Sequence, residues 1–326
     1  MHIPQRAIRS LQVSAIGLGC MGMTTSYHRS DPREALLTLQ YAVESGITLF
    51  DTAAAYGAGR NERFVGAALK PHRDRVAIAT KCGIRRIPPG IPIGLDGSPG
   101  AIRKELRASL QRLGVDHIDL YYLHRIDPKV PVEESVGAMA EAVQQGLVRE
   151  IGLSEATADQ LRRAHQVHPI VALESEWSLF SRDIEDSVLP AARELGVAIV
   201  PFSPLGRGML TATEQGSKKL GILDYRRTLP WWRKENIDAN LAAVSQIHAI
   251  ADSLGATTAQ VALAWVLGRG EDVIPIPGTA KRKHLQSNIG ALNVQLSPEH
   301  LQILESIRAQ GERFGSTDRR IGYKRE

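Results

Sequence analysis

Four polar side chains each follow an apolar run, at points where strands are expected to end. Asp51 and Tyr56 lie in TLFDTAAAYGAG, Lys81 ends VAIATK, and His124 ends IDLYYLH. An acid, a phenol, an amine and an imidazole brought together can transfer protons to and from a substrate. We therefore interpret these four residues as a candidate proton-transfer site rather than a packing motif.

Alternating strands and helices must position these side chains. Short apolar or β-branched runs predict eight strands, and segments with apolar residues at helical spacing lie between them. The strands are expected at residues 14–19, 48–51, 76–81, 117–124, 148–154, 170–174, 198–203 and 273–277. Eight strands, each followed by a helix, favour parallel pairing, and the closed arrangement is a (β/α)8 barrel of the TIM type. Because no linker, composition shift or internal repeat divides the sequence, we expect residues 1–326 to form a single barrel domain with an N-terminal hairpin.

Three stretches exceed a minimal barrel. They are the Gly- and Pro-rich segment after Lys81, the segment of about 207–236 that contains Trp231 and Trp232, and the basic tail after Ala309. In such barrels the loops at the carboxyl ends of the strands build the active site. We therefore expect long active-site loops, with Trp231 and Trp232 on a substrate loop and the tail either solvated or covering an anionic cofactor.

The composition is typical of a soluble enzyme. The chain is 43% hydrophobic, and 40 basic residues against 35 acidic residues give a net charge of +5, too small an excess to indicate a nucleic-acid partner. No apolar run approaches the ~18 residues of a membrane span, and the N-terminus lacks the apolar core of a signal peptide. We expect a cytoplasmic protein without a metal site, with Cys20 and Cys82 as small buried hydrophobes. The sequence leaves open whether it is a monomer or a homo-oligomer.

One motif points to a different fold. Gly17, Gly19 and Gly22 match G-x-G-x-x-G, which in a Rossmann fold binds a dinucleotide. That fold requires a helix that begins within the motif and an acid about 20 residues later, at the end of the second strand. Here the first helix is expected only from Asp31, and Asp51 lies too far along the chain. We therefore do not interpret the match as a dinucleotide site.

A series of segments carries a family resemblance. FDTAAAYGAGRNERFVGAAL, ATK, DLYYLHRID, EIGLSEA, PFSPLGRGML and IPIPGTAKRKHLQSNIGAL together resemble the aldo-keto reductase superfamily over about residues 8–308. The GLGCMGM start is most similar to its bacterial and plant oxidoreductases. The resemblance implies a (β/α)8 barrel that reduces carbonyl compounds with NADPH, and it places the catalytic residues at Asp51, Tyr56, Lys81 and His124.

These roles agree with the chemistry of the four groups. Hydride addition to a carbonyl leaves an alkoxide, which needs a proton from an acid such as Tyr56. A phenol with a pKa of about 10 gives up its proton reluctantly unless a cation stabilises the phenolate. Lys81 would supply that cation and Asp51 would hold it in place. His124 would orient the carbonyl as a neutral hydrogen-bond donor.

The resemblance also implies a set of cofactor contacts. Ser154 would bind the nicotinamide carboxamide and Phe202 would stack on the nicotinamide. The loop with Ser203, Leu205 and Arg207 would fold over the pyrophosphate, where a guanidinium matches phosphate oxygens. The segment after the last strand leads into a helix N-terminus with adjacent cations, which favours the 2′-phosphate of NADP. The residues expected there are Gly278, Thr279, Lys281, Arg282, His284, Ser287 and Asn288.

Two residues depart from the family pattern at the nicotinamide. Glu174 stands where many relatives have a glutamine that holds the carboxamide, and a carboxylate can accept from an amide NH2 but cannot donate to its carbonyl. Glu155 stands where many relatives have asparagine. Both departures bear on the nicotinamide contacts and on cofactor affinity.

Two other functions fit parts of the pattern. A nucleotide-binding regulatory subunit with the same fold, as in channel-associated relatives, would bind NADPH but turn over very slowly. An aldolase or isomerase barrel would use Lys81 as a Schiff-base nucleophile, which leaves Tyr56 and the cofactor-like segments unexplained. The sequence identifies neither the carbonyl substrate nor the physiological direction of the reaction.

Overall fold

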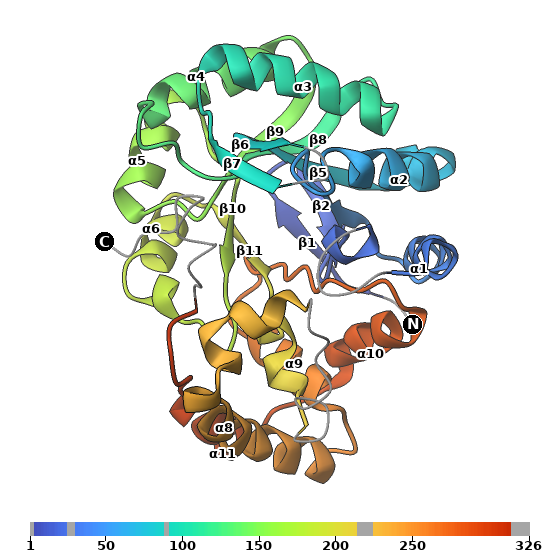
Figure 1. Cartoon of the computed structure of the whole chain (residues 1–326), viewed down its shortest axis with the longest axis vertical. Helices are drawn as coiled ribbons and strands as arrows, with labels where there is room; N and C mark the ends of the chain where they lie inside the picture. Colours follow the sequence, from blue (N-terminus) through green and yellow to red (C-terminus); the bar gives the residue numbers. More distant parts are fainter. Residues whose placement is uncertain (1–2, 25–29, 88–90, 214–223, 314–326) are drawn as a thin grey trace.

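Parallel strands form the centre of the molecule (Figure 1). The computed structural model describes residues 3–24, 30–87, 91–213 and 224–313. In spatial order, the strands of the main sheet are β3 (Leu18–Gly19), β4 (Leu49–Asp51), β5 (Ala77–Cys82), β8 (Ile118–Leu123), β9 (Val148–Ser154), β10 (Ala172–Glu176) and β11 (Ala198–Phe202). Each strand pairs with the next one in this order, as the sequence predicts.

The eighth position closes the sheet without forming a regular strand. Residues 272–278 lie between the two edge strands, β11 and β3. Ile274 N–H donates to a carbonyl of β11 at 2.8 Å, and Gly17 N–H donates to Pro275 O at 2.9 Å. Pro275 and Pro277 have no N–H, so this segment cannot complete a continuous ladder. The predicted (β/α)8 barrel is confirmed, with an eighth strand that proline makes irregular.

Gly17 and Gly19 are needed where this closing segment crosses the first strand. A Cβ on Gly19 would lie 2.8 Å from Ile276 O, and one on Gly17 would lie 2.9 Å from the Ile276 side chain. Two glycines of the G-x-G-x-x-G match, Gly17 and Gly19, therefore allow the close approach of the closing segment, and the first α-helix begins only at Pro32. The Rossmann alternative is wrong.

An antiparallel hairpin precedes the barrel. It consists of β1 (Gln5–Ile8) and β2 (Leu11–Ser14), so the strand expected at residues 14–19 is divided between β2 and β3. Ile8, Leu11 and Val13 pack into the same apolar cluster as Leu49 and Ala77, which lie at the amino ends of their strands. The hairpin thus covers that end of the barrel.

Side chains on the strands alternate between the barrel interior and the surrounding helices. On β5, Ala77 and Ala79 belong to the inner cluster and Ile78 to the outer one. On β8, Tyr122 points into the barrel interior, and its ring fills the space beside Gly152 of β9. A Cβ on Gly152 would lie 2.5 Å from the Tyr122 ring. A period of two then places the side chains at the carboxyl ends of these strands at the mouth of the interior.

Helices surround the sheet in chain order (Figure 1). They are α1 (Pro32–Glu44), α2 (Arg60–Leu69), α3 (Pro99–Leu113), α4 (Val132–Gln144), α5 (Ala158–Val167), α6 (Val188–Glu194), α8 (Lys234–Ser253), α9 (Thr258–Leu267), α10 (Arg282–Gly290) and α11 (Pro298–Ser306). Asp31 and Ser98 cap α1 and α3 through their side-chain oxygens, each followed by proline at the first helical position. Both helix starts agree with the sequence pattern.

The segment after Lys81 forms a second hairpin, of β6 (Ile84–Ile87) and β7 (Ile91–Leu95). Ile84 packs with Ala53 and Ala55, and Tyr56 borders this small apolar cluster. The first of the three predicted loops therefore lies against a candidate catalytic residue.

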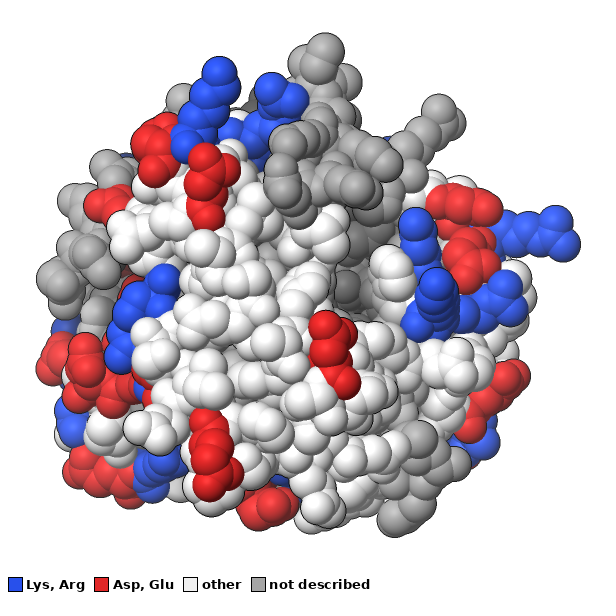
Figure 2. All heavy atoms as spheres, turned by 90° about the horizontal axis from the view of Figure 1, so that it is seen from below, with Lys and Arg blue, Asp and Glu red and all other residues white. Residues whose placement is uncertain are grey.

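Surface charges of both signs are interspersed on the face seen in Figure 2, and neither sign forms an extended patch there. Within the described ranges, no single helix is long and apolar enough to cross a membrane. The helices α8 and α9 meet that test only as a pair joined across a 93° bend.

Candidate active site

Lys81 and Asp51 form a buried ion pair at the carboxyl ends of β5 and β4. Lys81 Nζ donates to Asp51 Oδ1 and, at 2.9 Å, to Thr52 O. Glu174 Oε2 on β10 lies 3.3 Å from the same Nζ. Burial alone would lower the pKa of Lys81, but the charges of Asp51 and Glu174 raise it above its ordinary value. Lys81 is therefore an ammonium, whereas a Schiff-base lysine must be a neutral amine, so this geometry does not favour the aldolase alternative.

The turn between β4 and α2 holds Tyr56 over Lys81. The Tyr56 ring centre lies 5.2 Å from Lys81 Nζ. The next three residues, Gly57, Ala58 and Gly59, have φ of 59°, 53° and 82°, which bends the chain sharply into α2. Glycine adopts this conformation freely, but alanine does so only under strain. The tight turn thus fixes the position of the phenol.

Several charges act on the Tyr56 phenol. Burial raises the pKa of Tyr56 above its ordinary value, the Lys81 ammonium acts in the opposite direction, and the carboxyl groups of Asp51 and Glu174 add to the rise. The phenol therefore keeps its proton at neutral pH, and Lys81 is the main group that favours its release.

His124 faces Tyr56 from the end of β8. Its backbone N–H donates to Cys82 O at 2.9 Å, and its ring centre lies 5.8 Å from that of Tyr56 at an interplanar angle of 84°. Burial, together with the charges of Arg125 and Lys81, lowers the pKa of His124 well below its ordinary value. The imidazole is thus neutral, and the structure brings all four residues of the predicted proton-transfer site together.

Arg125 is a charged residue of this site that the sequence analysis did not single out. Its Nη1 donates to Ser154 Oγ at 2.9 Å and to His124 O, and its guanidinium carbon lies 5.9 Å from the Phe202 ring centre. The side chain is buried. Arg125 could have been found from the sequence, because it directly follows His124 at the end of a predicted strand. Ser154 and Phe202, predicted at the nicotinamide, therefore both lie near a buried cation.

Glu174 lies opposite Ser154 in the register of β10 and β9. Its side chain is 3% exposed and contacts Lys81. The departure from glutamine thus places a second carboxyl group beside the candidate catalytic lysine.

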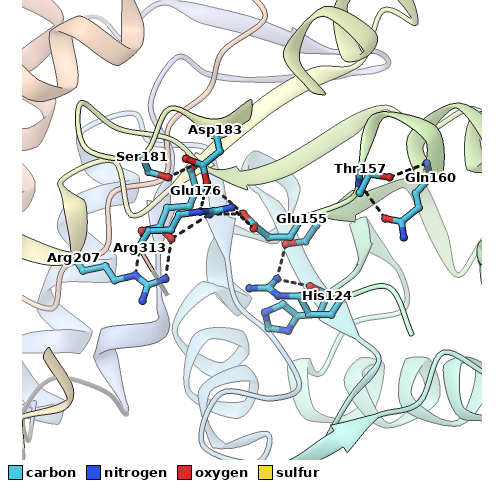
Figure 3. Close-up of polar contacts among 11 residues, drawn as sticks. His124, Glu155, Thr157, Gln160, Glu176, Ser181, Asp183, Arg207 and Arg313 are labelled. Atoms are coloured by element: carbon cyan, nitrogen blue, oxygen red, sulfur yellow. Dashed lines mark hydrogen bonds and ion pairs between the residues drawn. The ribbon is translucent and has the colours of Figure 1, made fainter. Parts of the chain in front are cut away.

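Two arginines join Glu155 and Glu176 at the mouth of the barrel (Figure 3). Arg207 binds Glu176 through two hydrogen bonds of 3.1 and 2.8 Å. Arg313 Nη2 donates to Glu155 Oε2 at 2.9 Å, and its Nη1 donates to Glu176 Oε2 at 3.4 Å. Arg313 Nε also donates to Asp183 at 3.0 Å. In this structure Arg207, predicted to meet phosphate, has a carboxylate partner, and the start of the basic tail lies against the site.

The loop predicted to cover the pyrophosphate begins with a strained turn. In this loop Ser203 and Arg207 have φ of 48° and 54°, and Glu155, directly after β9, has φ of 55°; non-glycine residues rarely adopt such values. Gly206 N–H donates to Ser203 O at 2.8 Å, and Leu205 packs against the core. Backbone strain of this kind concentrates at functional sites.

Glu34 of α1 occupies the N-terminus of α10. One of its carboxylate oxygens accepts from the Arg282 backbone N–H at 3.1 Å, and both oxygens pair with the Arg282 guanidinium at 3.2 and 3.1 Å. Thr279 Oγ1 accepts from Lys281 N–H at 3.1 Å. The same turn and helix carry the other residues predicted there: Gly278, His284, Ser287 and Asn288. The predicted phosphate site is thus a helix N-terminus at which a carboxylate of the protein already lies.

Trp231 and Trp232 lie in the short helix η6 (Pro230–Trp232). Trp231 is 1% exposed, packs edge-to-face on Phe180 at 5.7 Å between ring centres, and donates its Nε1–H to Gly311 O at 3.1 Å. The structure therefore gives Trp231 a packing position in the core instead of one on a substrate loop. Trp232, half-buried beneath the Arg226 guanidinium, stays a candidate for the pocket wall.

The two cysteines are buried. Burial raises the pKa of the Cys82 thiol to about 12 and that of Cys20 beyond its ordinary range. Thiols of this kind are poor nucleophiles, in agreement with their interpretation as small hydrophobes.

Comparison with known proteins gives a consistent result. The model of the Aldo/keto reductase family matches residues 15–309. The chain is 47% identical over 311 residues to the probable aldo-keto reductase 1 of Glycine max, an alignment that covers 92% of this chain and 87% of the relative. The structure is similar to that of the glycerol dehydrogenase AKR11B4 from Gluconobacter oxydans, with a TM-score of 0.85, 28% identity, and coverage of 94% and 95% of the two chains. It is also similar to the aldo-keto reductase AKR11C1 from Bacillus halodurans in its holo form, with a TM-score of 0.76, 27% identity, and coverage of 97% and 99%.

Proposed function

This chain belongs to the aldo/keto reductase family, whose members are oxidoreductases that generally use nicotinamide cofactors, and from this premise we propose that it reduces an aldehyde or ketone to the alcohol with NADPH. The observation that carries the proposal is the position of Tyr56, whose ring centre lies 5.2 Å from Lys81 Nζ and 5.8 Å from the His124 ring centre. A proton donor, a cation and a neutral imidazole thus face one point.

The residues around that point fit a polar, aromatic cofactor. Four buried side-chain atoms there have no hydrogen-bond partner within the described chain: Asp51 Oδ2, Tyr122 Oη, His124 Nδ1 and Glu174 Oε2. Buried polar atoms cost free energy when unpaired, so a polar ligand at the mouth would be stabilised there. Phe202, half-buried at the end of β11, offers an aromatic face beside them.

When bound, the cofactor supplies a hydride to the carbonyl carbon. Tyr56 gives its proton to the developing alkoxide, and Lys81 stabilises the phenolate that remains. Asp51 keeps the ammonium in place, while His124 donates a hydrogen bond that orients the carbonyl oxygen. In the alcohol-oxidising direction the same groups act in reverse.

We assign the cofactor contacts to the predicted residues. Ser154 and Glu174 would hold the carboxamide, and Phe202 would stack on the ring. Ser203, Leu205 and Arg207 would cover the pyrophosphate, with Arg207 exchanging Glu176 for phosphate oxygens. The start of α10 would hold the 2′-phosphate, which is the basis for choosing NADPH over NADH.

The test is a panel of aldehydes, ketones and quinones, followed by loss of NADPH absorbance, with glycerol and NADP+ added because one structural neighbour is a glycerol dehydrogenase. Turnover of at least one carbonyl compound that is lost in Tyr56→Phe supports the proposal. Tight NADPH binding with extremely slow turnover across the panel would instead favour the regulatory-subunit alternative.

A further inference from the structure

Lys81 has two carboxyl groups beside it but only one positive charge. Its ammonium carries three N–H groups, of which one donates to Asp51 and one to Thr52 O at 2.9 Å. Glu174 Oε2 lies 3.3 Å from Nζ, yet this oxygen accepts no hydrogen bond within the described ranges. Asp51 is therefore the direct partner of Lys81, and Glu174 is an additional acid.

This group lies almost completely out of solvent. The side chain of Lys81 is 0% exposed, that of Asp51 4% and that of Glu174 3%. An ionised Asp51 and Lys81 cancel, so ionisation of Glu174 would leave a net negative charge in a site almost closed to solvent. Such a charge is costly, and a buried carboxyl group usually takes up a proton instead.

The elements packed around Glu174 supply few compensating charges. Asp51 of β4 repels it, whereas Lys81 of β5 and Arg125, directly after β8, attract it. Tyr122 of β8 and Tyr56, in the turn after β4, also face it, and both phenols keep their protons because burial raises their pKa. β9 places Ser154 opposite Glu174, and β11 carries no titratable side chain.

The balance of these interactions favours the acid form. Burial raises the pKa of Glu174 to about 8, repulsion from Asp51 adds to the rise, and Lys81 and Arg125 offset part of it. The two carboxyl groups titrate as a coupled pair. Because Asp51 holds the direct hydrogen bond to Lys81, the proton resides on Glu174.

We propose that Glu174 is a positioning residue that carries a proton in the working enzyme, so that no second negative charge opposes the effect of Lys81 on Tyr56. This inference rests on the proposed reductase function. An ionised Glu174 would add a second negative charge near Tyr56 and make the phenol a weaker acid. A protonated Glu174 also has both a donor and an acceptor, as the amide of a glutamine has. Glu174 can therefore both donate and accept below about pH 8 and can only accept above that value.

The first test does not require activity. Infrared difference spectra of the wild-type protein and Glu174→Gln, both without cofactor, compare the carbonyl stretch of protonated carboxyl groups at pH 7. We expect this band in the wild type, its loss in the variant, and its disappearance from the wild type as the pH passes about 8. No difference between the two proteins at pH 7 would overturn the inference.

The second test is the pH profile of kcat. Wild-type kcat should fall by about tenfold between about pH 7 and about pH 9.5, as one acid ionises, and Glu174→Gln should stay level over the same range. Glu150→Gln is the control, because Glu150 is a buried acid near the amino end of β9, away from the site, and its profile should follow the wild type. The same alkaline fall in Glu174→Gln would contradict the inference. If no carbonyl compound is reduced but the infrared band behaves as expected, the proposed function fails and the protonation of Glu174 stands.

Discussion

Arg313 Nη2 lies 2.9 Å from Glu155 Oε2, which pairs the start of the C-terminal basic segment with an acid that follows β9 (Figure 3). The two side chains are 11% and 8% exposed. Burial acts to raise the pKa of Glu155, but Arg313 and Arg125 outweigh it, so the pKa is lowered below its ordinary value. A segment 158 residues from Glu155 in sequence thus stabilises a strained residue of the candidate cofactor site.

We predict that Arg313→Met lowers the free energy of unfolding at pH 7 by about 1–3 kcal/mol, because it leaves a buried carboxylate short of its partner. Since the folded-state pKa of Glu155 is depressed, this contribution is present above its unfolded pKa of about 4.3 and is lost as the pH falls further. Urea unfolding at pH 7 and below pH 4 measures the difference, which should shrink in acid.

Arg308→Met is the matched control, since Arg308 is exposed and its guanidinium donates to backbone carbonyls of Glu305 and Ile307. It should change stability by less than Arg313→Met at pH 7. Equal effects of both variants at each pH would show that the ion pair adds nothing.

Tyr56→Phe removes the proposed proton donor and leaves the ring in place over Lys81. We expect kcat to fall by ~10²-fold or more while NADPH affinity changes little. Tyr121→Phe is a suitable control, because Tyr121 is also a buried tyrosine but belongs to the outer cluster that faces the helices. Near-normal turnover of Tyr56→Phe would contradict the mechanism.

Lys81 should form no covalent intermediate. Wild-type protein incubated with a turned-over carbonyl compound and borohydride should show no mass increase on the peptide that contains Lys81, because the amine is held as a buried ammonium between Asp51 and Glu174. Lys81→Met should abolish reduction. A borohydride-dependent adduct would instead support an aldolase-type enzyme.

The sequence pattern predicted the barrel and the positions of Asp51, Lys81 and His124 because these depend on local information. Each residue follows an apolar run, and the carboxyl ends of parallel strands meet at one face of a barrel. Ser154 and Phe202, which were assigned through the family resemblance, likewise lie at the ends of β9 and β11. Their approach to one another is thus a consequence of strand order alone.

Contacts between distant side chains could not be predicted in this way. Nothing in the local pattern links Glu174 to Lys81, or Arg313 to Glu155, because periodicity identifies the face of a strand and not its partner across the barrel. The irregular eighth strand follows from Pro275 and Pro277, which were included in the predicted run. Trp231 is buried because its loop folds back on the core, which composition does not reveal.

Cofactor preference should depend on competition at the start of α10. Glu34 pairs with Arg282 there, so the carboxylate must be displaced or tolerated when the 2′-phosphate of NADPH binds. We expect Lys281→Ala/Arg282→Ala to weaken NADPH binding by about tenfold and NADH binding hardly at all, by loss of charge-assisted hydrogen bonds.

Glu34→Gln should have the opposite effect and strengthen NADPH binding by about two- to fivefold, because it removes a negative charge from a helix N-terminus that would then hold a phosphate. Both effects should shrink as salt rises, since the Arg282 and Glu34 side chains are partly exposed to solvent. Titration of each variant with NADPH and NADH, beside Lys70→Ala as an exposed lysine elsewhere, provides the measurement. An equal loss for both cofactors in the double variant would place the 2′-phosphate away from α10.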